Sequence, residues 1–160
     1  MSVFAIYDRL ERQVRELLAG ESDFMANGAN FAALVYHELP DLNWVGFYRC
    51  APSGDLVLGP FAGRPACTRL PAGHGVCGAA AARRASLVVD DVAAFADHIA
   101  CDTASRSEIV VPLFAGDRLW GVFDCDSPAL ARFGEEDRAG IERLVRAFSE
   151  ATQPPEPPAR

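Results

Sequence analysis

The order of the hydrophobic patterns constrains the fold of this chain more than any other feature. Apolar residues recur at steps of three and four in residues 3–18, 24–39 and 135–151, which predicts three amphipathic helices. The region between them carries short β-branched and aromatic runs separated by turn residues, which is typical of strands joined by hairpins. Helices at both ends of a set of strands predict an α+β fold, with one antiparallel sheet and helices packed on it.

The expected elements of the central region are short. The strands are expected over residues 43–49, 56–61, 64–70, 87–89, 108–114 and 119–126, and a short alanine-rich helix over 76–84. Residues 115–118 contain Gly116-Asp117 and predict a tight hairpin between the last two strands. Residues 92–106 follow no clear period and are expected to form a long loop with at most one helical turn.

The length of the chain predicts one domain. We assign residues 1–152 to it, while residues 153–160 contain four prolines in eight positions and are expected to be disordered. No apolar run approaches 18 residues, and no basic segment precedes an apolar stretch at the start, so neither a membrane span nor a signal peptide is expected. A cytoplasmic location follows as an expectation, and thiols there are kept reduced.

The charge balance excludes two classes of partner. With 15 basic and 22 acidic residues the net charge is −7 at pH 7. Nucleic acids and anionic membrane surfaces are bound by patches rich in lysine and arginine. We therefore expect no nucleic acid and no membrane as a partner.

The five cysteines fall into two groups. Cys50 and Cys125 are interpreted as small buried apolar side chains, and Cys125 lies in the middle of an expected strand. The other three lie beside turn or loop residues, where chemistry is often placed; they are Cys67, Cys77 and Cys101. No Cys-x-x-Cys pair exists, which argues against a zinc ribbon or a thioredoxin-type motif. For the three loop cysteines, a redox role and simple packing stay equally open at this point.

Three carboxylates are expected to meet at one end of the last hairpin. Asp124 and Asp126 lie on one face of a strand, and Cys125 between them points to the opposite face. Glu108 begins the neighbouring strand, near positions 124–126. Converging carboxylates favour a site for a small cationic or zwitterionic ligand, or for a metal. The alternative is a strand end exposed to solvent.

Two further motifs are weak. Residues 73–78 match the dinucleotide pattern G-x-G-x-x-G, but Pro71 precedes them closely and Asp90 lies only 12 residues beyond Gly78. A glycine turn that allows close backbone approach explains them better. His98 and Cys101 offer two metal ligands, but one such pair is more often a chance occurrence, and we expect no metal and no cofactor.

Several segments together resemble the free methionine-(R)-sulfoxide reductases, which are GAF domains. The resemblance covers about residues 20–150, and the spacing of 10 and 24 residues between its three cysteines is specific to that family. It rests on Asn43-Trp44-Val45-Gly46-Phe47-Tyr48, Leu56-Val57-Leu58-Gly59-Pro60-Phe61, Pro65-Ala66-Cys67, Gly75-Val76-Cys77-Gly78, His98-Ile99-Ala100-Cys101-Asp102, Ser105-Arg106-Ser107-Glu108-Ile109-Val110-Val111-Pro112, Gly121-Val122-Phe123-Asp124-Cys125-Asp126-Ser127-Pro128 and Arg132-Phe133.

The resemblance implies a GAF fold with about six strands, terminal helices on one face of the sheet, and a ligand pocket under loops and short helices on the other. It implies a thioredoxin-dependent oxidoreductase for free L-methionine-(R)-sulfoxide, with Cys101 as the catalytic thiol, Cys67 as the main resolving thiol and Cys77 as an additional one. The pocket would be lined by Glu108, Asp124 and Asp126, with Trp44 and Tyr48 closing its wall. A homodimer is left as an open alternative.

Our mechanistic reading of the residues makes Glu108 the proton donor to the leaving oxygen, because a carboxyl crowded by two others stays protonated more easily. Two rival functions stay open: a GAF-type sensor that catalyses nothing, and a thiol redox switch. Four positions also depart from the family pattern. Asp97 stands where glycine is usual, Ala96 where proline is common, His74 where arginine is common and Ala62 where glutamine is common.

Overall fold

A six-stranded antiparallel sheet forms the centre of the molecule. The computed structural model describes residues 2–159. The strands lie in the order β3-β2-β1-β6-β5-β4, so the two longest central strands are flanked by shorter ones. Their bounds are β1 (Trp44–Cys50), β2 (Leu56–Gly63), β3 (Arg69–Leu70), β4 (Leu87–Val89), β5 (Ser107–Ala115) and β6 (Arg118–Ser127).

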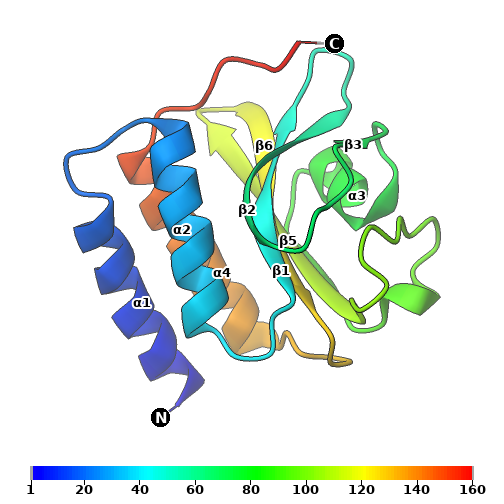
Figure 1. The fold of residues 1–160 in the computed structure, drawn as a ribbon, viewed down its shortest axis with the longest axis horizontal. Helices are drawn as coiled ribbons and strands as arrows, with labels where there is room; N and C mark the ends of the chain where they lie inside the picture. Colours follow the sequence, from blue (N-terminus) through cyan, green and yellow to red (C-terminus); the bar gives the residue numbers. More distant parts are fainter. Residues whose placement is uncertain (1, 160) are drawn as a thin grey trace.

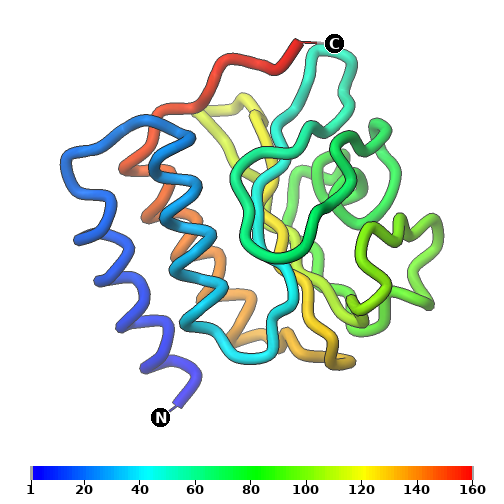
Figure 2. The backbone as a smooth tube through the Cα atoms, viewed as in Figure 1, coloured from blue at the N-terminus to red at the C-terminus, as the bar shows by residue number. Residues whose placement is uncertain are grey.

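The long helices cover one face of this sheet. They are α1 (Val3–Leu17), α2 (Phe24–Glu38) and α4 (Glu135–Ala151); α2 and α4 lie on the strands, and α1 packs against α4 (Figure 1). The opposite face carries α3 (Gly75–Arg83), the 3-10 turn η1 (Val92–Ala94) and the loop that follows it. The backbone trace in Figure 2 shows how these loops fold back over the strands. The expected α+β arrangement, one antiparallel sheet with helices packed on it, is confirmed.

Local sequence explains where the helices begin. The side chain of Ser2 accepts a hydrogen bond from the Ala5 N–H at the start of α1, and Asp23 accepts one from the Ala26 N–H at the start of α2. Both residues are favourable N-caps because they satisfy an amide that has no partner within the helix. At α4, Asp137 accepts from the Gly134 N–H at 3.0 Å.

Each face of the sheet has its own core. The face under the helices is filled by aromatic rings of α2, α4 and the central strands; they include Phe31, Phe47, Phe123 and Phe148. The other face holds a smaller cluster that includes Trp44, Tyr48, Val76 and Cys77. Alternation along β6 places Cys125 in the first cluster and Asp124 on the opposite face, as the sequence predicts. The second face is therefore the one that can hold a site.

The strand expected over residues 64–70 is much shorter than predicted. Only Arg69 and Leu70 form a strand on β2; the Thr68 carbonyl still accepts from the Leu58 N–H, and residues 64–67 leave the sheet. Pro65 has no N–H to give to a ladder, and Cys67 is drawn toward the opposite loop by a covalent bond described below. The other predicted elements agree with the observed bounds to within one or two residues.

The C-terminal segment has no helix or strand after residue 151. The Gln153 N–H donates to the Ser22 carbonyl, and an Arg69 guanidinium nitrogen donates to the Ala159 carbonyl. The disorder expected for this segment in solution stays a prediction. Among residues 2–159, no helix is long and apolar enough to cross a membrane.

Candidate active site

A pocket lies between the sheet and the elements that cover its second face. It is bounded by the first turn of α3, the loop of residues 95–106, the segment of residues 65–66 and the face of β1, β5 and β6. Of the residues predicted for the site, those lining this pocket are Trp44, Tyr48, Cys77, Cys101, Glu108, Asp124 and Asp126. Cys67 is not among the lining residues, but it is bonded to one of them.

Pairing of β5 with β6 brings the three carboxylates together. Glu108 lies opposite Asp126, and Asp124 lies opposite the next residue on the same face, Val110. Glu108 is 6% exposed and Asp124 is 5% exposed, so these groups are buried and do not fray into solvent. The prediction that the three carboxylates converge is confirmed by the strand register.

The carboxylates raise one another's proton affinity. Burial, followed by the charges of Asp124 and Asp126, holds the pKa of Glu108 well above its usual range. Burial and then Asp124 raise the pKa of Asp126 in the same way. Burial raises the pKa of Asp124 to about 6, while hydrogen bonds from Glu108 and Cys77 lower it. Within residues 2–159, no arginine forms an ion pair with any of the three. The pocket can therefore supply a proton near neutral pH or accept a cation.

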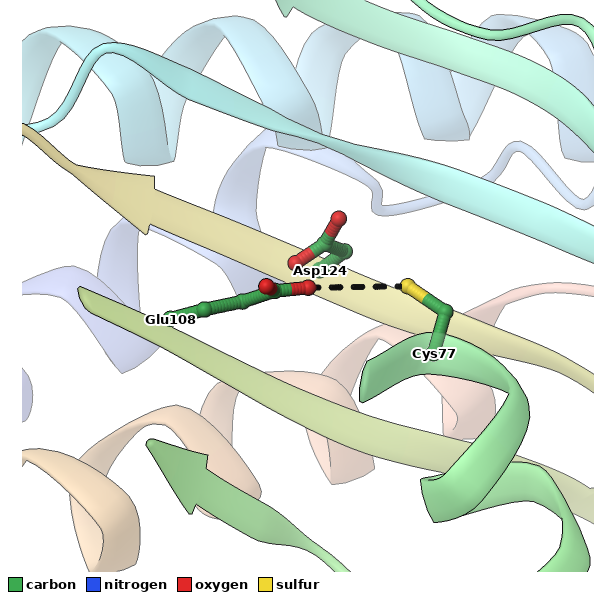
Figure 3. Close-up of side chains that lie close together, drawn as sticks. All are labelled: Cys77, Glu108 and Asp124. Carbon is green, nitrogen blue, oxygen red and sulfur yellow. Dashed lines mark hydrogen bonds between the residues drawn. The ribbon is translucent and has the colours of Figure 1, made fainter. Parts of the chain in front are cut away.

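Cys77 reaches into this acidic group from the first turn of α3. Its Sγ lies 3.9 Å from Oε1 of Glu108, and Figure 3 shows Cys77, Glu108 and Asp124 pointing toward one another from α3, β5 and β6. Burial, and then the neighbouring carboxylates Asp124 and Glu108, keep the pKa of the Cys77 thiol well above its ordinary value. Cys77 is thus a protonated and buried thiol at the pocket.

Cys67 and Cys101 form a disulfide. Their Cα atoms lie 5.4 Å apart, although 34 residues separate them in the chain. Both side chains are partly buried, whereas Cys77 is almost fully buried. The bond joins the loop that precedes β3 to the loop that precedes β5. Two thiols that can bond to each other therefore lie at the edge of a pocket lined with acids.

Trp44 and Tyr48 support the Cys67 segment in addition to forming the pocket wall. The Tyr48 hydroxyl donates to the Cys67 carbonyl at 2.9 Å, and Trp44 Nε1 donates to the Arg64 carbonyl at 3.2 Å. The two rings stack with their centroids 5.8 Å apart. The sequence placed these rings in the wall of the pocket, but their hydrogen bonds to residues 64–67 were not predicted.

Sequence reasoning also missed Asn43. Its Nδ2 donates to Oδ2 of Asp102 and to Oγ of Ser105, each at 3.0 Å, and its backbone N–H donates to the Asp126 carbonyl. One amide thereby ties the loop beside Cys101 to the edge of the sheet. No spacing rule indicates this role, because Asn43 and its partners lie about 60 residues apart in the chain.

His74 and Asp97, two of the positions that depart from the family pattern, contact each other. His74 Nδ1 lies 2.7 Å from Oδ2 of Asp97, and both side chains are more than half exposed. Asp97 has a φ of 67°, a left-handed conformation that glycine adopts more easily. The pair links the start of α3 to the loop that carries His98 and Cys101. Nε2 of His98 lies 3.9 Å from Oε2 of Glu108, so His98 is a pocket residue.

The glycine motif has a structural role. A Cβ atom on Gly78 would lie 2.8 Å from the carbonyl carbon of Gly73, and Gly73 and Gly75 both have positive φ values. This close approach folds the chain so that α3 can present Cys77 to the pocket. Cys50 lies at the end of β1 and is partly buried, and Cys125 faces the helices, so neither of these cysteines lines the pocket.

Known proteins resemble this chain over most of its length. The sequence profile described as GAF domain matches residues 12–151. A protein of Escherichia coli named free methionine-R-sulfoxide reductase is 48% identical to this chain, and the match covers 91% of this chain and 87% of that protein. A protein of the same name from Saccharomyces cerevisiae is 34% identical, and the match covers 91% of this chain and 85% of that protein. The crystal structure of the free methionine-R-sulfoxide reductase of Neisseria meningitidis in complex with its substrate superimposes with a TM-score of 0.90 at 45% identity, covering 94% of this chain and 90% of that one.

Proposed function

Because this chain belongs to the GAF-domain family of free methionine-R-sulfoxide reductases, we propose that it reduces free L-methionine-(R)-sulfoxide to L-methionine with the thiols of Cys101 and Cys67. The observation that carries the proposal is the bonded pair itself, placed beside a pocket lined by three carboxyls, of which those of Glu108 and Asp124 are buried. A disulfide between these two cysteines is the state that one turnover would leave behind.

The first step is attack of the Cys101 sulfur on the sulfoxide sulfur. The sulfoxide oxygen must gain a proton as its bond to the methionine sulfur breaks, and Glu108 is our candidate donor. Burial raises the pKa of Glu108, so its carboxyl can stay protonated near pH 7. The oxygen moves to Cys101, which becomes a sulfenic acid, and methionine is released. The substrate sulfur is reduced by two electrons and Cys101 is oxidised by two.

The second step closes the disulfide. The Cys67 thiol attacks the sulfenic sulfur of Cys101, the S–S bond forms and water leaves with the oxygen. An external dithiol then exchanges with the disulfide and restores both thiols. We propose thioredoxin as this dithiol, acting in the cytoplasm. Cys67 and Cys101 are both partly exposed, which supports access by such a reductant. Cys77, our additional resolving thiol, is 3% exposed.

The acids also give a reason for selecting the free amino acid. Free methionine sulfoxide carries an ammonium group, and the carboxylates Asp124 and Asp126 can hold it in a site without competing cations. Incorporation into a peptide removes that charge, which leaves two buried carboxylates without a counterion. Trp44 and Tyr48 would form the apolar wall beside the methyl sulfoxide group.

A single assay separates this proposal from its rivals. Oxidation of NADPH is followed in a thioredoxin-coupled mixture with four substrates: the R and S sulfoxides, each free and within a peptide. We expect turnover with the free R form and at most slow turnover with the other three. A GAF-type sensor or a thiol redox switch would give no substrate-dependent oxidation of NADPH, and that result would overturn the proposed function.

A further inference from the structure

We propose that Cys77, Glu108 and Asp124 form a binding site for a thiophilic divalent cation, with zinc as the favoured ion. One ligand atom from each side chain lies within 4.8 Å of the other two, and all three residues are buried (Figure 3). One sulfur and two oxygen ligands with a fourth position open to water is a combination that zinc accepts. The reaction proposed above uses this pocket for an organic substrate and needs no metal.

The geometry is close to what a tetrahedral zinc ion requires. Zinc–sulfur bonds of about 2.3 Å and zinc–oxygen bonds of about 2.1 Å place neighbouring ligand atoms about 3.3–3.6 Å apart. Cys77 Sγ lies 3.9 Å from Glu108 Oε1. All three ligand atoms lie within 4.8 Å of one another, so side-chain shifts of up to about an ångström would complete the site, and the β5–β6 pairing keeps the two carboxylates in place.

A second observation points to a missing ligand. Oδ1 of Asp124 is fully buried and has no hydrogen-bond partner among residues 2–159. Such an atom costs free energy unless a guest in the pocket satisfies it. Cys77 and Glu108 are neighbours of this carboxylate, so a cation placed between the three side chains would coordinate it and relieve the repulsion between the carboxylates.

Cys77 supplies the sulfur ligand of the proposed site. It reaches the two carboxylates from the first turn of α3. Zinc would displace the proton of the thiol, and it would bind in the disulfide form as well, because Cys77 is not part of the disulfide.

The consequence is a competitive relation between metal and substrate. A cation held by Glu108 and Asp124 occupies the carboxylates that the proposed mechanism assigns to the substrate and to the leaving oxygen. The metal would therefore inhibit the reductase. The inhibition rests on the proposed function, but the binding of the metal does not.

Cobalt(II) added to the purified, oxidised protein tests the binding directly. With Cys67 and Cys101 bonded, the remaining thiols are Cys50, Cys77 and Cys125. We expect one equivalent of cobalt to give a thiolate-to-metal absorption band in the near ultraviolet, and zinc to displace it. Cys77→Ser should abolish the band, and the matched variant Cys50→Ser should keep it. The absence of a band in the wild type, or its persistence in Cys77→Ser, would overturn the proposal.

A second variant protects the test against misfolding. Asp124→Asn keeps the thiol and should weaken cobalt binding at least tenfold. Mutation of a residue that only hydrogen-bonds to a metal ligand typically lowers metal affinity tenfold or more, and removal of a ligand itself should cost at least as much. Unchanged affinity in this variant would also overturn the site. Free methionine sulfoxide should remove the band from the cobalt-loaded wild type, and a band that persists at saturating sulfoxide would overturn the inhibition.

The two proposals fail separately. Cobalt binding in a protein without reductase activity would leave the metal site standing and remove the proposed function. Reductase activity in a protein that gives no cobalt band would remove the metal site and leave the proposed function standing.

Discussion

At the level of single residues, three cysteines near the pocket differ in burial and bonding, and we expect these differences to set their chemistry. Cys67 and Cys101 are partly exposed and bonded, whereas Cys77 is buried against two carboxyls. Burial and the negative neighbours of Cys77 raise its thiol pKa, which makes it a poor nucleophile at neutral pH. These surroundings favour Cys67 as the thiol that resolves an oxidised Cys101.

The first prediction concerns this division of roles. Cys67→Ser should release about one equivalent of methionine per chain in a single-turnover experiment and then stop, because the sulfenic acid on Cys101 finds no ready thiol. Cys101→Ser should release none, and Cys50→Ser should cycle like the wild type. Methionine is measured by amino-acid analysis after mixing with free methionine-(R)-sulfoxide. Normal cycling of Cys67→Ser with thioredoxin would transfer the resolving role to Cys77.

The second prediction concerns the pH dependence of stability. Burial raises the pKa of Asp124 from an ordinary 3.8 to about 6 in the folded chain. The folded state therefore binds the proton more tightly than the unfolded state, and this contribution is fully present below pH 3.8 and is lost as the pH rises through about 6. Asp124→Asn removes the titrating group, so the variant should not lose this stability as the pH rises. At pH 7 it should therefore be more stable than the wild type by about 1–3 kcal/mol.

Urea unfolding at pH 4, 5, 6 and 7 measures this effect. The difference between variant and wild type should grow with pH and be smallest at pH 4. Asp90→Asn, which changes an exposed aspartate outside the pocket, serves as the control and should show no such trend. A difference that is constant across the range would mean that Asp124 does not titrate as described.

At the scale of elements, the packing of α1 on α4 depends on one small residue. A Cβ atom on Gly140 would lie 2.2 Å from Cγ of Tyr7, whose ring is 1% exposed. The Tyr7 hydroxyl donates to Asp137 at 2.8 Å, and Arg132 also contacts that carboxylate at 3.0 Å. The ring cannot move away without breaking this buried network, so glycine is required where the two helices cross.

The third prediction follows from this contact. Gly140→Ala should lower the free energy of unfolding by about 1–3 kcal/mol, because the cost of overpacking exceeds the roughly 1 kcal/mol that alanine gains as a helix former. Thermal unfolding followed by circular dichroism measures the change. Arg146→Ala on the exposed side of the same helix is the control, with an expected change under about 0.5 kcal/mol. A Gly140→Ala protein as stable as the wild type would show that the helices can separate without cost.

At the scale of the whole molecule, the disulfide closes a loop across the second face of the sheet. Cys67 and Cys101 lie 34 positions apart, and the segment between them includes α3 and β4, so the bond ties together most of the structure that covers the pocket. Closing a loop of this length restricts the unfolded chain by about 3–4 kcal/mol in the chain-entropy description. The redox state should therefore change the stability of the molecule as well as its chemistry.

The fourth prediction is that a mild reductant lowers the free energy of unfolding of the wild type by up to about 3–4 kcal/mol. Urea titrations with and without dithiothreitol measure the difference. Cys101→Ser cannot form the bond and should be insensitive to the reductant. Equal stability of the oxidised and reduced wild type would indicate that strain in the folded state cancels the entropic gain.

Local sequence was enough to predict the elements and the region where the acids meet. Helical and strand periodicity depend on local side-chain spacing, and hairpin pairing of neighbouring strands follows from a short turn, so Glu108 could be placed near positions 124–126; the observed register then pairs it with Asp126. The resemblance to a family supplied the expected roles of Cys67 and Cys101, because spacing along the chain does not report which thiols meet.

Only the tertiary structure decided which distant segments touch. The contacts of Tyr48 with Cys67, of Asn43 with Asp102 and of His74 with Asp97 join loops that have no periodic pattern. The strand predicted over residues 64–70 begins only at Arg69 for the same reason. A cross-link to a loop 34 positions away outweighs a weak local preference for strand pairing. Such contacts depend on how the sheet brings loops together, and local sequence carries no signal for that.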